Sequence, residues 1–368
     1  MKAKEILKTM QPYKPGKQIE EVKKEYGLKE IVKLASNENP FGFSPQVKKE
    51  LPGLISGLEK YPDGYAAELR RILSDKLEVN ETQLIFGNGS DEIVQIICRT
   101  YLEAGTNTVM ATPTFPQYKH NALIEGSEIR EVPVIDGYHD LDRMLEAIDD
   151  HTRVVWLCTP NNPTGSHIAA PDMEKFLERC PDDVLVVVDE AYYEYMDASD
   201  YYDAVAGLKK HPNLIVLRTF SKAYGLAGLR IGYGIARTEV IHQLDPAREP
   251  FNTSTIAQAA AIIALEDKKF LNESVTRNKD NRKAMMDFCD EQELGYFDSQ
   301  ANFLLINLPV SGDELFEHLL SKGFIVRSGE ALGIPNSIRL TIGSKEVMEQ
   351  IQQEISHFLS SNKTGVKK

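Results

Sequence analysis

The sequence has few cysteines and lacks long apolar runs. Its four cysteines, Cys98, Cys158, Cys180 and Cys289, are scattered, with no pair at the spacing of a metal site. We therefore expect no bound metal, and we expect buried, reduced thiols in a cytoplasmic protein. No run of about 18 apolar residues occurs, so no membrane-spanning helix is expected. The first residues, MKAKEILKTMQPYKPGKQ, hold no apolar core of a signal peptide, and none is expected.

An excess of positive charge is also missing. The formal net charge is −13, and no basic run offsets it, so a nucleic acid is not an expected partner. Hydrophobic residues make up 42% and charged residues 26% of the chain, which is typical of a globular protein. The length of 368 residues exceeds that of a usual single domain and favours one large domain with a smaller one.

Short apolar runs alternate with amphipathic stretches through the middle of the chain. Residues 90–102 are predicted to form a helix, with Ile93, Ile96, Ile97 and Tyr101 on one face. Residues 169–180 are helical in pattern as well. The strand-like runs lie in residues 83–89, 106–115, 153–165, 182–195 and 212–222. This βαβ rhythm predicts an α/β fold with a mostly parallel sheet between two layers of helices.

The last third has a different pattern and predicts a smaller α/β unit. Strand-like segments cover 301–309, 323–329 and 337–343, and helical patterns cover 312–323 and 344–360. Residues 246–265 are predicted to bridge the two units by a long helix. We expect an N-terminal segment at 1–45 that packs on the small domain and on a partner. A large domain is expected at 46–250 and the small domain, with its linking helix, at 251–368.

Polar clusters follow several of the predicted strands, where open parallel sheets bind ligands. In FGNGSDE, Gly87 and Gly89 permit a tight turn, and the helix beginning near Ser90 offers free backbone N–H groups to a phosphate. The alternative is that Ser90 or Asp91 caps the helix and nothing binds. A dinucleotide fingerprint would place a glycine where Glu92 stands.

Two further clusters supply amides, a carboxylate and a phenol. In TPNNPTG, Asn161 and Asn162 can donate to an anionic oxygen, or they can serve only as turn formers. In VVVDEAYYEY, Asp189 ends a run that suits a strand buried on both faces, so its carboxylate needs a partner. The alternative roles are helix capping by Asp189 and core packing by Tyr192.

The fourth cluster is TFSKAYGLAGLRIGYG, in which Lys222 stands among small residues. Thr219 and Ser221 precede it, and Arg230 follows eight positions later (230 − 222). A lysine is usually solvated, so this stretch alone does not indicate chemistry. A phosphate cradle, an amide donor, a buried carboxylate, a tyrosine and a lysine at one sheet edge together suit pyridoxal phosphate, whose aldehyde forms a Schiff base with a lysine.

The motifs NNPTG, VVVDEAYYEY and SKAYGLAGLRIGYG, in this order, resemble those of the fold-type I pyridoxal-phosphate aminotransferases. The resemblance narrows to the histidinol-phosphate aminotransferase family on four further segments, LASNENPFG, EKYPDGYAAEL, ANFLLI and SIRLTIG. This resemblance covers almost the whole chain and implies a large domain with a mostly parallel seven-stranded sheet plus a smaller α/β domain. It also implies transamination between histidinol phosphate and 2-oxoglutarate, which gives imidazole-acetol phosphate and glutamate in histidine biosynthesis.

The resemblance further implies roles for individual residues. Lys222 would carry the cofactor as a Schiff base and act as general base, Asp189 would pair with the pyridine nitrogen, and Tyr192 would join them as a catalytic residue. Tyr192 and Asn162 would contact the phenolic oxygen. The cofactor phosphate would be held by Gly89, Ser90, Asp91, Thr219, Ser221 and Arg230. Phe115 would stack on the ring, where the family often has tyrosine, and position 224 has tyrosine where phenylalanine is common.

Substrate contacts are implied for Tyr13, Asn37, Arg327 and Arg339; the planar guanidinium group suits phosphate and carboxylate. A surface ion pair is the alternative for Arg327. Tyr61 would reach the phosphate of a neighbouring subunit, which implies a homodimer. Rival interpretations are an aromatic amino-acid aminotransferase of the same fold, a pyridoxal-phosphate-dependent decarboxylase of a phosphorylated amino acid, a nicotinamide dehydrogenase and a non-catalytic binding protein.

Overall fold

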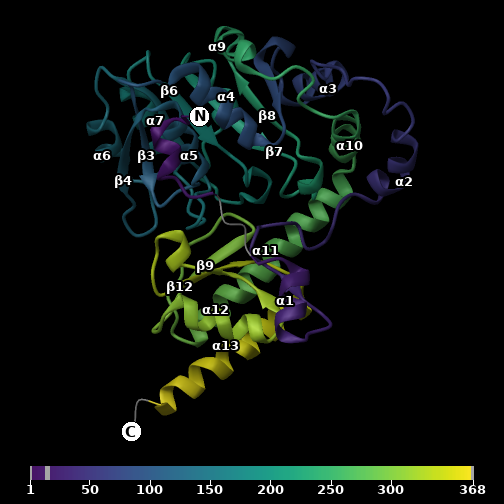
Figure 1. Cartoon of the computed structure of the whole chain (residues 1–368), viewed down its shortest axis with the longest axis vertical. Helices are drawn as coiled ribbons and strands as arrows, with labels where there is room; N and C mark the ends of the chain where they lie inside the picture. The colour runs from purple at the N-terminus through teal and green to yellow at the C-terminus, as the bar shows by residue number, and fades with distance from the viewer. Residues whose placement is uncertain (1, 13–16, 366–368) are drawn as a thin grey trace.

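The computed structural model describes residues 2–12 and 17–365, without the side chains of 362–365, and shows two units joined by a long helix (Figure 1). The larger unit is built on a seven-stranded sheet in the order β2-β8-β7-β6-β5-β3-β4. Its strands are β2 (Leu84–Gly87), β3 (Asn107–Thr112), β4 (Glu128–Pro133), β5 (Thr152–Cys158), β6 (Leu185–Asp189), β7 (Leu214–Thr219) and β8 (Gly232–Ala236). All neighbouring strands run parallel except β8, which is antiparallel to both β2 and β7.

Helices cover both faces of this sheet, as the sequence predicts. The helices of the larger unit are α2 (Pro45–Leu54), α3 (Ala67–Leu77), α4 (Ser90–Tyr101), α5 (Gln117–Glu125), α6 (Leu141–Glu146), α7 (Ala170–Arg179), α8 (Ala204–Gly207), α9 (Thr238–Leu244) and α10 (Thr255–Glu266). One core contains residues of α2, α3, α6, α7, α8 and α10, and the other contains residues of α4, α5 and α9. Strand β6 is buried along its whole length between them, which explains its unbroken run of branched residues.

The smaller unit has its own core and sheet. Strands β11 (Arg327–Ser328), β12 (Ser337–Thr341) and β9 (Phe303–Asn307) form an antiparallel sheet in that order. Its helices are α11 (Lys268–Glu291), α12 (Gly312–Ser321) and α13 (Lys345–Gly365). The predicted helical stripe of α13 is confirmed, because Ile351 and Ile355 lie in the core of this unit and Val347 packs against it.

The N-terminal segment contacts both units. The 3₁₀ helix η1 (Glu5–Lys8) lies against α5, whereas α1 (Ile19–Tyr26) packs on the smaller unit. Strand β1 (Val32–Lys33) pairs in parallel with β10 (Phe324–Ile325) of the smaller unit. Residues 32–44 therefore run along the junction between the units, where they can contribute to a shared site.

The connection between the units differs from the predicted long helix over 246–265. That stretch is divided into η5 (Asp245–Ala247), an irregular segment and α10, whose N-cap Ser254 accepts a hydrogen bond from the Ala257 amide. Pro246 and Pro250 interrupt the helix, because proline lacks the amide donor. Helix α10 packs on α2 and α3, and α11 spans the two units (Figure 1). The domain boundary after residue 250 stays a proposal.

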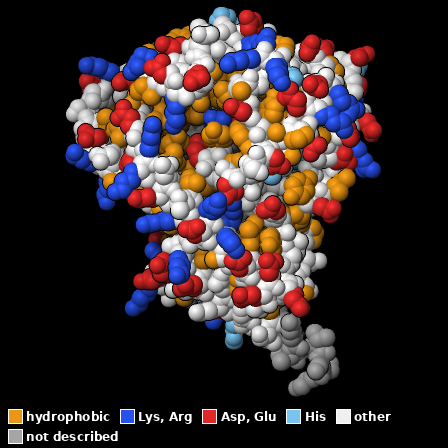
Figure 2. All heavy atoms as spheres, turned by 180° about the vertical axis from the view of Figure 1, so that it is seen from behind, with side chains coloured by type: hydrophobic (Ala, Val, Ile, Leu, Met, Phe, Trp, Pro, Cys, Tyr) orange, Lys and Arg blue, Asp and Glu red, His pale blue; other side chains and the backbone are white. Residues whose placement is uncertain are grey.

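The remaining 3₁₀ helices are η2 (Glu81–Gln83), η3 (Tyr193–Tyr195), η4 (Ala227–Leu229) and η6 (Glu330–Leu332). Figure 2 shows basic and acidic side chains interspersed over one face of the molecule. Among the helices of the described part of the chain, none is long and apolar enough to cross a membrane.

Candidate active site

A cavity of about 950 Å³ opens where the two units meet, at the carboxyl ends of β5, β6 and β7. The larger unit contributes the polar residues that follow its strands, the N-terminal segment contributes residues 35–37, and the smaller unit contributes its two arginines on β11 and β12. Of the predicted site residues, the cavity is lined by Asn37, Ser90, Asp91, Phe115, Asn162, Asp189, Tyr192, Thr219, Ser221, Lys222, Arg230, Arg327 and Arg339.

Lys222 follows β7 and is partly buried in the cavity wall. Its Nζ donates a hydrogen bond of 3.0 Å to the backbone oxygen of Ser36, and it lies 5.7 Å from the centre of the Tyr192 ring. Burial, helped by the positive charge of Arg339, lowers the pKa of the Lys222 amine to about 8. A substantial neutral fraction near physiological pH is the state that a nucleophile or base requires.

Asp189 ends β6 and is 3% exposed. Its Oδ2 accepts a 2.6 Å hydrogen bond from the phenol of Tyr118, and its Oδ1 accepts one of 3.1 Å from the Ala191 amide. Burial nevertheless raises the pKa of Asp189 to about 6, above its ordinary value. A positive charge placed beside this buried carboxylate would favour its ionised form and return it to full ionisation.

Two asparagines bind the neighbouring polar side chains of the site. The Asn37 amide donates to the Tyr192 hydroxyl over 2.9 Å, and Asn37 Oδ1 accepts from the Thr341 hydroxyl. Asn162 Oδ1 accepts a 2.5 Å hydrogen bond from Arg339 Nη1. These contacts link the N-terminal segment, the larger unit and the smaller unit around one cavity.

The other asparagine of the NNPTG turn has an internal role. Asn161 is fully buried, donates to the Pro113 carbonyl and to Thr164, and accepts from Thr114. It therefore acts as a turn former, the alternative that the sequence left open, and it is Asn162 that faces the cavity.

The beginning of α4 has the features of an anion cradle. Gly89 is its N-cap with φ of 79°, and no side-chain cap hydrogen bond closes this end of the helix. A Cβ on Gly89 would come within 2.5 Å of Arg230 Nη2, so a larger residue would displace that guanidinium. Capping by Ser90 or Asp91 is not observed, and the helix amides are left for a ligand.

Arg230 completes this end of the cavity. Its guanidinium donates to Ser221 Oγ over 3.3 Å and pairs with Asp91 Oδ2 at 3.3 Å. Thr219 Oγ1 accepts from the Ser221 amide, which orients the loop that leads to Lys222. The basic group and the hydroxyl groups thus gather beside the helix terminus, as the sequence motif indicates.

The two arginines of the smaller unit differ in their partners. Arg339 is 6% exposed and donates from Nη2 to the Ala35 carbonyl over 2.7 Å as well as to Asn162. Arg327 is half-buried, lines the cavity, and makes no side-chain hydrogen bond or ion pair with any residue that the structure describes. Because β11 and β12 pair Arg327 directly with Arg339, the two residues are neighbours across the sheet.

Of the described residues predicted for the site, Gly89 and Tyr61 are not among those that line the cavity of this single chain. Tyr61 is 82% exposed, stacks on Phe251 with ring centres 4.8 Å apart, and is not among the lining residues. Tyr13 lies outside the described residues.

Tyr118 is a residue that the sequence interpretation missed. It is fully buried, binds Asp189, and stacks on Trp156 with ring centres 4.6 Å apart. Its position one turn after Phe115 in TPTFPQY is compatible with a core residue, so only the fold reveals its contact with the carboxylate.

Comparison with known proteins agrees with this geometry. Residues 29–355 match the model of the family described as aminotransferase class I and II, and the chain belongs to this family. The sequence is 58% identical to the histidinol-phosphate aminotransferase of Geobacillus sp. (strain WCH70), with 98% of each chain covered. It is also 58% identical to the histidinol-phosphate aminotransferase of Bacillus subtilis (strain 168), over 98% of this chain and 100% of the relative. The fold is similar to the crystal structure of histidinol-phosphate aminotransferase from Sinorhizobium meliloti in complex with pyridoxal-5'-phosphate, with a TM-score of 0.88, 27% identity and 97% of each chain covered.

Proposed function

We propose that the protein transfers an amino group between histidinol phosphate and 2-oxoglutarate, giving imidazole-acetol phosphate and glutamate in histidine biosynthesis. The observation that carries this proposal is the 58% identity to histidinol-phosphate aminotransferases over nearly the whole chain. The cavity supports it, because it joins a partly neutral lysine amine, a buried carboxylate and an anion cradle. We also propose a cytoplasmic location, which the four free, buried cysteines suit.

The residues present fit pyridoxal phosphate. The open start of α4, with Arg230 and Ser221 beside it, suits the phosphate, and the buried Asp189 carboxylate suits a protonated ring nitrogen. Phe115 provides an aromatic face for stacking, and Tyr192 and Asn162 supply polar groups for the phenolic oxygen. When bound, this cofactor supplies an aldehyde for the amine and a ring that accepts electrons from the substrate.

Lys222 performs two tasks in the proposed reaction. Its Nζ would hold the cofactor covalently, and when free its amine would take the proton from the substrate Cα, for which its lowered pKa suits it. Asp189, ionised and held by Tyr118 and the Ala191 amide, favours the positive charge on the ring nitrogen during this step.

Arg327 and Arg339 are proposed to bind the two substrates. Arg327 has no partner among the described residues, so its guanidinium can bind the phosphate of histidinol phosphate or the distal carboxylate of 2-oxoglutarate. Arg339, positioned by Asn162 and Ala35, is suited to the anionic group nearer Lys222. Asn37 lies between Tyr192 and Thr341 and supports the same wall of the cavity.

We further propose that the enzyme is a homodimer in which Tyr61 contacts the cofactor phosphate of the other subunit. The supporting observation is that Tyr61 and Phe251, which stack on one another, are both exposed, as are Ile55, Leu58 and Tyr65, which lie near Tyr61 in the sequence. Exposed apolar side chains of this kind are typical of an interface. Co-expression of an inactive Tyr61→Ala chain with an inactive Lys222→Ala chain should restore part of the activity, since one of the two mixed sites would be intact.

The substrate assignment is tested by steady-state kinetics of the purified protein. We expect kcat/KM for histidinol phosphate to exceed that for phenylalanine and tyrosine. A higher value for either aromatic amino acid would favour the aromatic aminotransferase, and release of CO₂ without any need for an oxo acid would favour a decarboxylase.

A further inference from the structure

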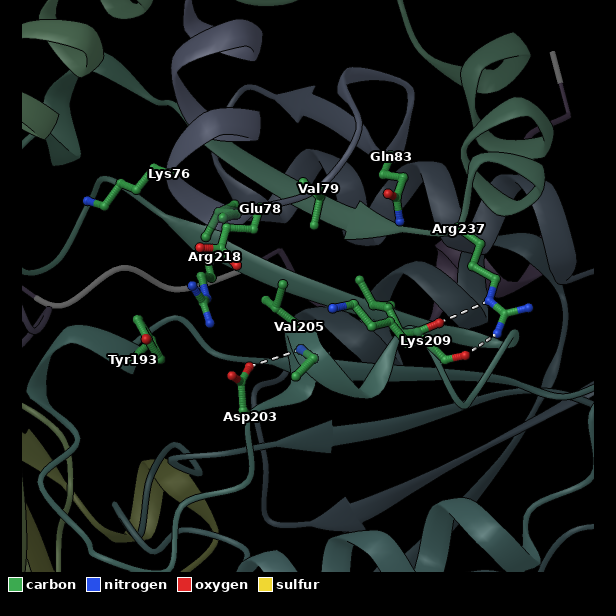
Figure 3. A pocket seen from close by; sticks show the side chains of 13 residues that line it. Lys76, Glu78, Val79, Gln83, Tyr193, Asp203, Val205, Lys209, Arg218 and Arg237 are labelled. Atoms are coloured by element: carbon green, nitrogen blue, oxygen red, sulfur yellow. Dashed lines mark hydrogen bonds between the residues drawn. The ribbon is translucent and has the colours of Figure 1, made fainter.

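A second cavity, of about 560 Å³, lies in the larger unit between α3, α8, η3 and β7 (Figure 3). Leu77, Val79, Val205 and Leu208 form its apolar part. It shares no lining residue with the cavity at the junction of the two units. It is therefore a separate space, and the activity proposed above leaves it without a role.

The two cavities lie on opposite sides of the same protein wall. Along β7, Arg218 lines the second cavity, whereas the next residue, Thr219, lines the catalytic one. After β6, Tyr193 lines the second cavity and Tyr192 the catalytic one. Neighbouring residues of a strand point to opposite sides of the sheet, which explains the arrangement on β7.

The second cavity has a positive lining in a chain whose net charge is −13. Its basic residues are Lys76, Lys209, Arg218 and Arg237, and its acidic ones are Glu78 and Asp203. Asp203 is engaged in capping α8, because its carboxylate accepts from the Ala206 amide over 3.0 Å. Arg237 is engaged with the carbonyls of Leu208 and Lys209.

Two cationic groups remain to face the cavity. Arg218 is 4% exposed; its Nε donates to Glu190 Oε2 over 2.8 Å, and its guanidinium lies 3.5 Å from the centre of the Tyr193 ring. A guanidinium has five N–H donors; Glu190 takes the one on Nε, and Tyr233 is a further hydrogen-bond partner, so Arg218 keeps donors for a ligand. The exposed Lys209 amine makes no hydrogen bond or ion pair with any described residue. Figure 3 shows the Lys209 amine directed toward Val205, with Arg218 on the far side of Val205 and its guanidinium directed toward Tyr193; Lys76 points away from both.

We propose that this cavity binds a small organic anion, a carboxylate or a phosphate ester with a compact apolar body. The head group would bridge Lys209 and the outer edge of the Arg218 guanidinium, and the apolar body would rest on Val205 and the Tyr193 ring. The buried arginine supplies directional donors, and the exposed lysine supplies attraction at the entrance.

Two probes with the same body and different head groups test the proposal: benzoate and phenyl phosphate. They are titrated by calorimetry into the cofactor-loaded Arg327→Ala variant, in which anion binding at the catalytic cavity is weakened. We expect saturable binding of at least one probe, with a Kd of about 1 mM or tighter. The tighter probe identifies the head group. No saturable binding of either probe would overturn the proposal.

Three further changes in the Arg327→Ala background locate the bound probe. Lys209→Glu reverses a charge of the site and should weaken binding by at least ~10-fold. Lys345→Glu makes the same change in net charge on an exposed residue of α13 in the smaller unit and should have no effect. Val205→Phe fills the cavity without a change of charge and should also abolish binding. Equal affinities for the Lys209→Glu and Lys345→Glu proteins, or retained binding in Val205→Phe, would show that the probe binds elsewhere.

Discussion

The phenol of Tyr118 donates a 2.6 Å hydrogen bond to Oδ2 of Asp189, and both side chains are buried. Tyr118 stacks on Trp156, whose indole N–H donates to Thr108 over 2.8 Å, so the phenol is held in place. This hydrogen bond lowers the pKa of Asp189 and opposes the larger effect of burial, which raises it. Tyr118 is thus a positioning residue for the carboxylate that would hold the cofactor ring.

Replacing Tyr118 by phenylalanine should make Asp189 harder to ionise. We expect kcat to fall by about tenfold at pH 7 and to recover in part at higher pH, because the loss of one charge-assisted hydrogen bond shifts the pKa upward. The measurement is the pH profile of kcat. Tyr101→Phe, which removes a surface hydrogen bond to Gln243, is the matched control. A profile for Tyr118→Phe that superimposes on this control would contradict the positioning role.

Asp189→Asn should separate catalysis from stability. In the cofactor-loaded enzyme it should reduce kcat by at least ~100-fold, since an amide cannot balance a protonated ring nitrogen. In the cofactor-free protein it should be stabilising, because burial raises the pKa of Asp189 to about 6. The folded state favours the neutral carboxyl. Its contribution to the free energy of unfolding is therefore fully present below the ordinary aspartate pKa of 3.8 and is lost as the pH rises through the folded-state pKa of about 6.

The stability part of this prediction is measured as the Tm of cofactor-free protein at pH 5 and pH 8. At pH 8 the variant should melt about 3 °C higher than the wild type, and the difference should shrink toward pH 5. A lower Tm for the variant at pH 8 would mean that the ionised carboxylate stabilises the fold even without the cofactor.

The lowered pKa of Lys222 predicts how fast the cofactor-free protein captures pyridoxal phosphate. Covalent capture requires the neutral amine, so the rate should rise about tenfold between pH 7 and pH 9 and level off above a pKa of about 8. Stopped-flow absorbance of the cofactor records this rate. Lys222→Ala should show no covalent capture and no turnover while it still folds. A rate that does not change with pH, or near-normal activity of Lys222→Ala, would contradict the assignment.

Arg339→Lys should slow both half-reactions, because a lysine cannot donate at once to Asn162 and Ala35 and still offer a planar group to a ligand. Arg327→Lys keeps the charge of a residue that has no partner among the described residues, so its effect should be smaller and confined to KM. Single-turnover rates with each substrate separate the two half-reactions. Damage to only one half-reaction in Arg339→Lys would indicate separate sites for the two substrates.

Much of the fold, and the set of polar groups at the candidate site, could be predicted from the sequence because both depend on local patterns. The branched run at 184–188 marks a strand buried on both faces, and a helix beginning at Ser90 after two glycines follows from backbone geometry. Asp189 and Lys222 stand at the ends of the neighbouring parallel strands β6 and β7, and Arg230 precedes β8, which is antiparallel to β7, so all three lie at one sheet edge.

Relationships between distant segments were decided by the tertiary structure alone. The contact of Tyr118 with Asp189 joins residues 71 positions apart, and nothing in TPTFPQY distinguishes this tyrosine from a core residue. The sequence implied substrate contacts for both Arg327 and Arg339, but packing of the N-terminal segment engages Arg339, whereas Arg327 has no partner among the described residues. The second cavity exists only because α3 and α8 approach β7 from different parts of the chain. Local pattern therefore determined the elements and the reactive groups, whereas long-range packing determined which of those groups remain available.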